Sequence, residues 1–342
     1  MLLIENHDFY DKLSADCAAL QIACLHPELV DVDFLARRMQ AWLDGPNSGL
    51  LPWLDQRAEI LSSPFASRPW AKSLLLITFL PVPEPNSPLL QLPKAQPGRP
   101  ATRLAAYTLN EDYHQSGRRI LAEISSRLDL PDGSFEVGVD SGPLLEKNLA
   151  ARAGLGIYGF NSLLRTAQWG TQAHLGYLFC ARQLPAQIYQ PKMSPACADC
   201  QRCWQNCPNQ ALSPKDGLQI KLCRSFLANE KKGPLTWKEQ QLLGGALAGC
   251  SLCSTCCPGA NSLPGRDLDI DAEELCKVPS AWLKQKIKGT VLEHIGVSRL
   301  KRNAAAALGT QLEPIQRGAM QEELLRKQSS EAVKRTIEAW PT

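Results

Sequence analysis

Residues 197–208 read Cys-Ala-Asp-Cys-Gln-Arg-Cys-Trp-Gln-Asn-Cys-Pro. This spacing is that of bacterial ferredoxins, in which three closely spaced thiolates hold one 4Fe-4S cluster and the fourth ligates a second cluster. Zinc is the alternative for clustered cysteines, but four-ligand zinc sites usually use two separated pairs, and a terminal Cys-Pro has no role in them. The run therefore predicts two 4Fe-4S clusters and the transfer of electrons through them.

A second cysteine run follows and can be read in two ways. Read as Cys250-x2-Cys253-x2-Cys256, it makes adjacent Cys256 and Cys257 serve different clusters, although neighbouring Cα atoms are only about 3.8 Å apart. Read as Cys250-x2-Cys253-x3-Cys257-Pro, it keeps Cys-Pro at the crossing position and leaves one missing ligand, which Cys223 can supply. We prefer the second interpretation. One cluster then has the ligands Cys197, Cys200, Cys203 and Cys257, and the other has Cys207, Cys223, Cys250 and Cys253.

The composition is that of a globular protein in a reducing compartment. The 342 residues allow two or three domains at roughly 150 residues each, and 44% hydrophobic with 21% charged residues excludes disordered, collagenous and membrane classes. Most of the 13 cysteines crowd into one stretch, which indicates metal ligation rather than disulfides. The start of the chain lacks a basic region and a long apolar segment, and no apolar run approaches the roughly 20 residues of a membrane helix. We expect a cytoplasmic protein with no membrane partner.

Helices and strands alternate ahead of the cysteine runs, and a helical region follows them. An apolar run at 74–80 predicts a buried strand, and the alternation of Phe135–Val139 predicts a strand that delivers Asp140 at its end. Prolines between 185 and 195 mark a boundary. The pattern also predicts helices over 8–44 with a break near Pro27, a helix over 107–128, a helix over 144–153, a strand over 175–181 and helices over 272–340. The expected fold class is α+β, with an α/β-type first domain.

Gly154-Leu-Gly156-Ile-Tyr-Gly159 matches the dinucleotide-binding fingerprint, but its context does not. That fingerprint follows a strand and is followed by an acidic residue about 20 positions later. Here a predicted helix precedes it, and no Asp or Glu occurs between Lys147 and Asp199. A glycine-rich loop that lets the backbone approach another flat or bulky ligand fits better.

Several motifs together resemble tRNA epoxyqueuosine reductase, and the resemblance spans nearly the whole chain. The motifs are Asp112-Tyr-His114, Val139-Asp-Ser-Gly-Pro-Leu-Leu-Glu146, Ala153-Gly-Leu-Gly156, Asn161-Ser-Leu-Leu164, Cys223-Arg-Ser-Phe-Leu227, Arg302-Asn-Ala-Ala-Ala-Ala-Leu-Gly309 and both cysteine runs. That family is an iron-sulfur, cobalamin-dependent group of oxidoreductases that reduces the epoxide of epoxyqueuosine to an alkene in the tRNA anticodon loop. The resemblance implies a cobalamin-binding catalytic domain at 1–185, a two-cluster ferredoxin-like domain at 186–270 and a helical HEAT-like domain at 271–342 with a possible tRNA contact.

The resemblance also implies roles for individual residues. The family's catalytic acid falls on Asp140, which could protonate a leaving oxygen if burial raises its pKa. The tRNA anticodon stem-loop and an external electron donor are the implied partners, and basic residues between Lys284 and Arg302 are candidates for phosphate contacts. The candidate cofactor contacts are Tyr113, His114, Gly154, Gly156, Gly159 and Asn161.

Two other functions are compatible with the residues. A related cobalamin and iron-sulfur reductase could act on another substrate, as reductive dehalogenases do, and the chain departs from the family pattern at Ile157, Tyr158, Phe160 and Gly259. A plain electron-carrier protein without cobalamin is the second alternative. The long region ahead of the cysteines, more than one typical domain, is excess for a carrier.

Overall fold

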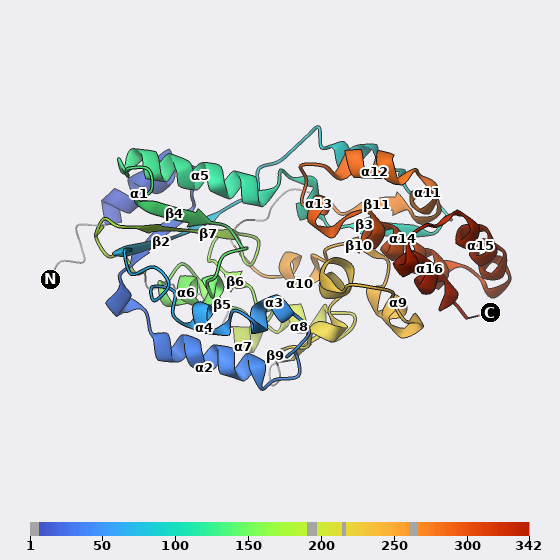
Figure 1. Ribbon diagram of the computed structural model, residues 1–342, viewed down its shortest axis with the longest axis horizontal. Coiled ribbons are helices and arrows are strands. Elements are labelled where there is room, and N and C mark those ends of the chain that lie inside the picture. The colour runs from blue at the N-terminus through green and yellow to red at the C-terminus, as the bar shows by residue number, and fades with distance from the viewer. Residues whose placement is uncertain (1–6, 190–196, 214–216, 260, 262–265, 342) are drawn as a thin grey trace.

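The computed structural model describes residues 7–189, 197–213, 217–259, 261 and 266–341. The molecule is elongated, with one of its two larger sheets in each half and the cysteine region beside the junction between them (Figure 1). The predicted boundary at 185–195 lies largely outside the described residues. No helix in the described part of the chain has both the length and the apolar character needed to cross a bilayer.

The first sheet has four strands in the order β1-β2-β7-β4, and each neighbouring pair is antiparallel. All residues of the central strand β2 are buried. Successive side chains of a strand point to opposite faces, so both faces of this strand must be covered. The four strands are β1 (Gln21–Leu25), β2 (Ser73–Phe79), β4 (Phe135–Gly138) and β7 (His174–Cys180).

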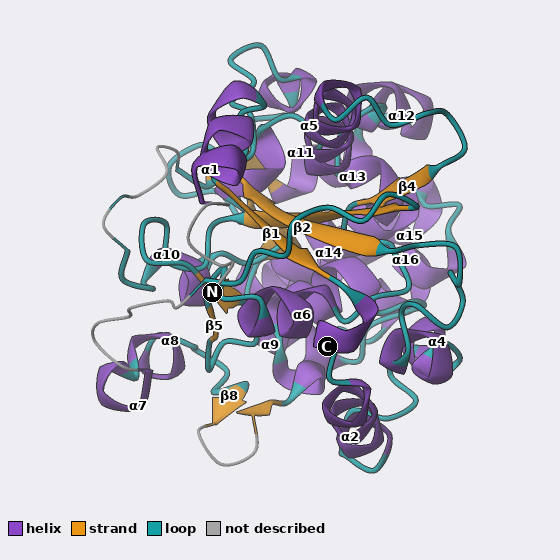
Figure 2. Cartoon of the chain, turned by 90° about the vertical axis from the view of Figure 1, so that its left-hand side faces the viewer, coloured by secondary structure: helices purple, strands orange, loops and turns teal. Residues whose placement is uncertain are grey.

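Helices cover both faces of this sheet (Figure 2). Leu75, Ile77 and Phe79 pack with residues of α1 (His7–Asp16) and α5 (Tyr113–Arg127). The alternate residues Leu74 and Leu76 pack with residues of α2 (Val32–Leu43) and α6 (Glu146–Arg152) on the other face.

The strands predicted at 74–80, 135–139 and 175–181 are confirmed as β2, β4 and β7. The prediction of only helices over 8–44 was wrong at Gln21–Leu25, which forms β1. A short apolar run reads the same in a helix and in a buried strand, and pairing with β2 decides between them. The helix expected from 107 begins at Tyr113, because the Asp112 carboxylate caps it by accepting from the His114 backbone N–H at 2.9 Å.

The second sheet joins distant parts of the chain. Its order is β10-β3-β11, so a strand from ahead of the cysteine runs lies between one strand that comes just before the second run and one that follows it. The domain boundaries expected from the sequence stay a prediction. Strand β3 belongs to the first expected domain, yet it pairs with two strands that lie beyond residue 186. The strands are β3 (Ala101–Leu104), β10 (Ala246–Ala248) and β11 (Leu268–Asp271).

The buried helix α14 (Val297–Gln311) packs against this sheet and is surrounded by the other C-terminal helices. The helices expected over 272–340 are confirmed. They are α11 (Ala272–Lys277), α12 (Ser280–Ile287), α13 (Leu292–Ile295), α14, α15 (Pro314–Lys327) and α16 (Glu331–Glu338).

Short elements make up the cysteine region and the loops around the first sheet. Those of the cysteine region are α7 (Cys197–Cys200), α8 (Arg202–Gln205), β8 (Leu212–Ser213), β9 (Gly217–Leu218), η4 (Ile220–Leu222), the π-helix η5 (Phe226–Glu230), α9 (Trp237–Leu243) and α10 (Leu252–Thr255). Those of the loops are η1 (Pro27–Leu29), α3 (Pro52–Asp55), α4 (Ala58–Ser62), η2 (Pro88–Gln91), η3 (Ala106–Leu109), β5 (Ile157–Tyr158) and β6 (Leu164–Arg165).

Candidate active site and metal centres

Asp140 lies in a tight loop directly after β4. Its φ of +58° is in the left-handed region, which Asp tolerates better than most residues but which is uncommon outside glycine. The loop lies against the ring of Tyr177, since a Cβ on Gly138 or Gly142 would meet the Tyr177 hydroxyl at 2.3 and 2.1 Å. The Asp140 side chain is exposed, and its Oδ2 accepts a hydrogen bond of 2.8 Å from the Tyr113 hydroxyl.

Three aromatic rings stack beside this carboxylate. Tyr113 stands between His114 and His174, with ring centroids 4.2 and 4.5 Å away. Burial, followed by the negative charge of Asp140, raises the pKa of the Tyr113 phenol. Burial lowers the pKa of His174 to about 4. At neutral pH the stack therefore offers a phenol O–H and an uncharged imidazole to the space around Asp140.

Tyr107 connects this site to the cysteine region. Burial raises its pKa to about 12, and the charges of Cys250, Asp140 and Cys223 all add to the effect. Its hydroxyl interacts with the Asn229 side chain and packs against Gly249, where a Cβ would lie 2.4 Å from the Tyr107 oxygen. The Tyr107 phenol thus lies within electrostatic range of both the candidate acid and two cysteines of the predicted second cluster.

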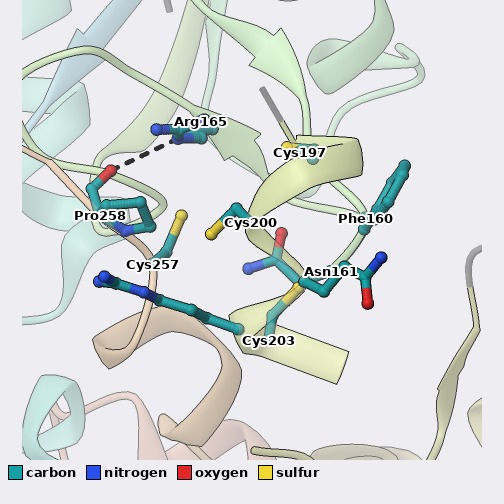
Figure 3. Close-up of a pocket in the computed structure, with 11 residues that line it drawn as sticks. Phe160, Asn161, Arg165, Cys197, Cys200, Cys203, Cys257 and Pro258 are labelled. Atoms are coloured by element: carbon teal, nitrogen blue, oxygen red, sulfur yellow. Dashed lines mark hydrogen bonds between the residues drawn. The ribbon is translucent and has the colours of Figure 1, made fainter. Parts of the chain in front are cut away.

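The predicted ligands of the first cluster come together. Cys197, Cys200, Cys203 and Cys257 line one pocket together with Gly159, Asn161 and Arg165. Figure 3 shows these thiols bordering a common space between α7, α8 and the loop that carries Pro258. Four thiolates around one hollow are the donor set that a 4Fe-4S cluster requires, with one thiolate for each iron.

The predicted ligands of the second cluster are also neighbours. Cys250 is close enough to Cys223 and Cys207 for their charges to raise its pKa, and Cys253 responds in the same way to Cys250 and Cys223. The Cys207 sulfur accepts a hydrogen bond of 3.3 Å from the Ala211 backbone N–H. The residues present therefore fit two clusters, although the ligand assignment itself stays a prediction.

Cys256 and Cys257 differ in position. Cys257 lines the pocket with the first-run cysteines, whereas Cys256 is absent from that lining. The Cys256 sulfur instead lies 3.7 Å from the Cys253 carbonyl oxygen, to which its thiol donates. This geometry favours the interpretation in which Cys257, ahead of Pro258, is the crossing ligand.

Asn161, which lines the pocket of the first-run cysteines, also holds the second cysteine run. Its amide nitrogen donates to the Cys253 carbonyl and to the Thr171 hydroxyl, both at 3.0 Å. The Ser254 hydroxyl donates to the Thr171 carbonyl, also at 3.0 Å. The loops around 161 and 171 are thereby bonded to α10.

The glycines of the predicted cofactor loop are needed by the protein's own packing. A Cβ on Gly154 would meet the Tyr189 carbonyl oxygen at 1.9 Å, and one on Gly156 would meet the Arg165 carbonyl oxygen at 2.4 Å. On Gly159 it would meet the Asn161 side chain at 2.8 Å. Their lack of a side chain is thus explained without a ligand.

Comparison with known proteins finds one group of similar sequences. Residues 196–260 match the model of a 4Fe-4S double cluster binding domain. The chain is 28% identical over 297 residues to the epoxyqueuosine reductase of Salmonella typhimurium, covering 82% of this chain and 75% of that protein. The chain is thus similar to epoxyqueuosine reductases in sequence over about four fifths of its length. It contains a 4Fe-4S double cluster binding domain.

Solved structures support the shared fold. The epoxyqueuosine reductase of Streptococcus thermophilus superposes with a TM-score of 0.76 at 19% identity, covering 97% of this chain and 88% of that one. An epoxyqueuosine reductase crystallised with an epoxyqueuosine-modified tRNA-Tyr stem loop has a TM-score of 0.72 at 20% identity, covering 97% and 96%.

The prediction of a basic face over residues 284–302 was wrong at its C-terminal end. Lys301 and Arg302 are buried, and the Lys301 ammonium donates to the Val278 carbonyl oxygen at 2.6 Å. A fully buried guanidinium is stable only where its N–H groups are bonded. Lys284 and Lys288 are exposed, and Lys286 is partly exposed.

Arg302 and its neighbour Asn303 form a clamp on the chain between Cys223 and Cys250. Arg302 donates to the carbonyls of Leu227, Lys231 and Gly233 at 2.6 to 2.9 Å. Asn303 donates to the carbonyls of Ala228 and Leu247 at 3.0 and 2.8 Å. The Arg302-Asn303 clamp therefore has a structural role.

The condition set for Asp140 as an acid, burial of its carboxylate, is not met, because this side chain is exposed. Sequence reasoning also missed Tyr107, His174 and Glu146, which the fold brings to the same site. Glu146 belongs to the motif that carries Asp140, and that proximity was the available signal. Tyr107 and His174 had none, because only the folded chain brings them to Asp140.

The departure at Gly259 has a packing reason. A Cβ at this position would lie 2.4 Å from the Gly170 backbone nitrogen and 2.8 Å from the Gln168 carbonyl oxygen. The loop that contains Trp169 fills the space beside Pro258, so a side chain at position 259 would collide with the backbone of that loop.

Proposed function

We propose that this chain reduces epoxyqueuosine to queuosine at the wobble position of tRNA, using electrons that two 4Fe-4S clusters deliver to cobalamin. The observation that carries the proposal is the position of Tyr107. It lies within electrostatic range of Asp140 and of the cysteines Cys223 and Cys250. An acid next to an electron path is what a reductive deoxygenation needs.

The cysteines hold the clusters in this proposal. Cys197, Cys200, Cys203 and Cys257 take one cluster, and the remaining set takes the one nearer Tyr107. Asn161 keeps Cys253 in place through its bond to the Cys253 carbonyl, so its role lies with the cluster rather than with cobalamin.

Tyr113 and His114 are the residues best placed to hold cobalamin, since a flat aromatic stack next to an exposed carboxylate suits a broad ring with polar edges. Gly154, Gly156 and Gly159 could contribute backbone contacts only, because their Cβ directions are occupied. Bound cobalamin supplies a strongly reducing metal centre that no side chain can provide.

Asp140 supplies a proton to the epoxide oxygen. The Tyr113 hydroxyl bonded to Oδ2 orients the carboxyl group, and the tight loop after β4 projects it into the open space. General acids of this kind contribute about 10²- to 10⁴-fold in rate. His174 stays uncharged and adds no competing cation to the site.

The partners follow from the reaction. We propose that the anticodon stem-loop binds across the site, with Lys284 and Lys288 as phosphate contacts because they remain exposed. An external one-electron donor reduces the clusters. The reaction takes place in the cytoplasm, where tRNA is present and thiols stay reduced.

Reconstitution tests the proposal. The iron-loaded protein is incubated with hydroxocobalamin, desalted and examined by visible spectroscopy. It is then reduced with titanium(III) citrate and mixed with an epoxyqueuosine-modified stem loop. The RNA is digested, and the masses of its nucleosides are measured by mass spectrometry. We expect bound corrinoid and queuosine, which is lighter by one oxygen.

Each alternative gives a different result. An electron carrier binds no corrinoid. A related reductase with another substrate binds corrinoid but leaves epoxyqueuosine unchanged.

A further inference from the structure

We propose that Glu146 is a second acid of this site, a positioning residue that restores the proton of Asp140 during turnover. This inference rests on the proposed function. Glu146 is the first residue of α6 and lies behind the Asp140 loop, at the end of the same motif.

Glu146 is a buried carboxyl group with one oxygen that no described residue pairs. It is 9% exposed, and its Oε1 has no hydrogen-bond partner among the described residues. Burying an ionised carboxylate with one oxygen unpaired is unfavourable, so the group keeps its proton instead. Burial, followed by the charge of Asp140, raises the pKa of Glu146 well above its ordinary value.

The two carboxyl groups form an unequal pair. The Asp140 backbone hydrogen-bonds with the Glu146 carboxyl, and the two side chains interact electrostatically. The other charged or titratable groups that face Glu146 are Lys147 on its own helix and Tyr177 on β7. Asp140 is exposed to the substrate side whereas Glu146 is buried, which separates an outer donor from an inner proton store.

The stoichiometry of the reaction requires such a store. Reduction of an epoxide to an alkene breaks two C–O bonds, forms the C=C double bond and releases the oxygen as water. It consumes two electrons, from the external donor through the clusters, and two protons. Asp140 carries one proton and becomes a carboxylate once it has donated it. Glu146 passes its proton to that carboxylate and regains one from water after product leaves.

The neighbouring groups are poorer sources of the second proton. The pKa of Tyr113 is raised, which makes its phenol a weaker acid than a free tyrosine. His174 has a pKa of about 4 and carries no extra proton at neutral pH. Glu146 alone among these is a carboxyl group that burial keeps protonated.

The test uses Glu146→Gln, which keeps the shape and the acceptor oxygen but cannot transfer an acid proton. The full-length, cluster-loaded protein is assayed over several turnovers from pH 5 to pH 9, while Glu123→Gln on the exposed face of α5 serves as the matched control. In the wild type and the control, the rate falls as pH rises through the Glu146 pKa, because Glu146 then loses the proton that it passes to Asp140. In Glu146→Gln this limb is absent and the rate at neutral pH is lower by about 10- to 100-fold. Glu146→Asp, which keeps an acid at shorter reach, restores part of the rate.

A readout without substrate accompanies the assay. The infrared spectrum of the protein at neutral pH should show a protonated carboxyl band that disappears in Glu146→Gln and persists in Asp140→Asn. Loss of the band in Glu146→Gln together with the changed profile supports the inference. A Glu146→Gln variant with the wild-type pH profile, or with no band lost, overturns it. Failure of the proposed function looks different, because the wild type itself would then make no queuosine.

Discussion

The Asp140 site and the cysteine region are built in opposite ways. Asp140, Tyr113 and His174 lie at the ends of β4, α5 and β7, which are parts of the first sheet and its covering helix and pack against one another. The cysteines sit on turns and helices of four residues, which cannot hold their own geometry. Side chains from far along the chain hold them instead, above all Asn161 and the Arg302-Asn303 clamp.

The two regions therefore tolerate different changes. The acid site depends on its own side chains, because the sheet keeps the backbone in place. The cluster sites depend on their ligands and equally on residues that touch no metal. The predictions below separate the two cases, beginning with the largest expected effect.

Cys223→Ser should remove one cluster and abolish epoxide reduction, because the cluster beside Tyr107 loses a ligand. The iron content should fall from about eight to about four atoms per chain. Chemical iron analysis with electron paramagnetic resonance measures this loss. A variant that keeps about eight irons would mean that another residue completes the second cluster.

Arg302→Met should lower the free energy of unfolding by about 3 kcal/mol, since it leaves buried carbonyls without their charged donor. Denaturant unfolding measures the loss. Arg326→Met, on the exposed face of α15, is the matched control and should change the free energy by less than about 0.5 kcal/mol. Equal effects of the two variants would show that the clamp does not support the cysteine region.

A double change of Lys284 and Lys288 to Gln should weaken stem-loop binding by several-fold and flatten its salt dependence. Each lost phosphate contact reduces the slope of log K against log salt by about 0.7 to 0.9. Binding is followed by fluorescence anisotropy between 50 and 200 mM salt, salt concentrations for which such slopes are steep. Changing Lys12 and Lys72, which are exposed in the other half, removes the same charge and should leave the slope unaltered. An unchanged slope in the first pair would place the RNA elsewhere.

Cys256→Ser should have the smallest effect, with about eight irons and full activity retained. The reason is that Cys257, rather than Cys256, lines the space with the first-run cysteines. Loss of iron in this variant would restore the alternative interpretation of the second run.

The sequence predicted well whatever depends on local chemistry. Cysteine spacing is fixed by the shape of a cluster, so the two runs indicated the iron-sulfur module that the family comparison confirms. The alternation of Phe135–Val139 likewise located β4 and, with it, Asp140. Strand β1 was missed, because its identity comes from pairing with β2 rather than from its own residues.

What the sequence could not predict depends on contacts between distant segments. Arg302 looked like a surface cation in a basic stretch, and only the fold shows that it bonds carbonyls some 70 positions away. Tyr107 looked like an ordinary helix residue, yet in the fold it lies within electrostatic range of both Asp140 and the cysteines. The glycine-rich loop suggested ligand contact, whereas its glycines fit against Tyr189 and Arg165.

Single turnover of Asp140→Asn tests the central claim most directly. Cluster-loaded and corrinoid-loaded protein is reduced before mixing with an epoxyqueuosine-modified stem loop, so that electron supply does not limit the rate. The account predicts that the variant keeps both clusters and its bound corrinoid but forms queuosine about 10²- to 10⁴-fold more slowly than the wild type. Queuosine formation by Asp140→Asn at the wild-type rate would contradict the claim that Asp140 is the acid of this site.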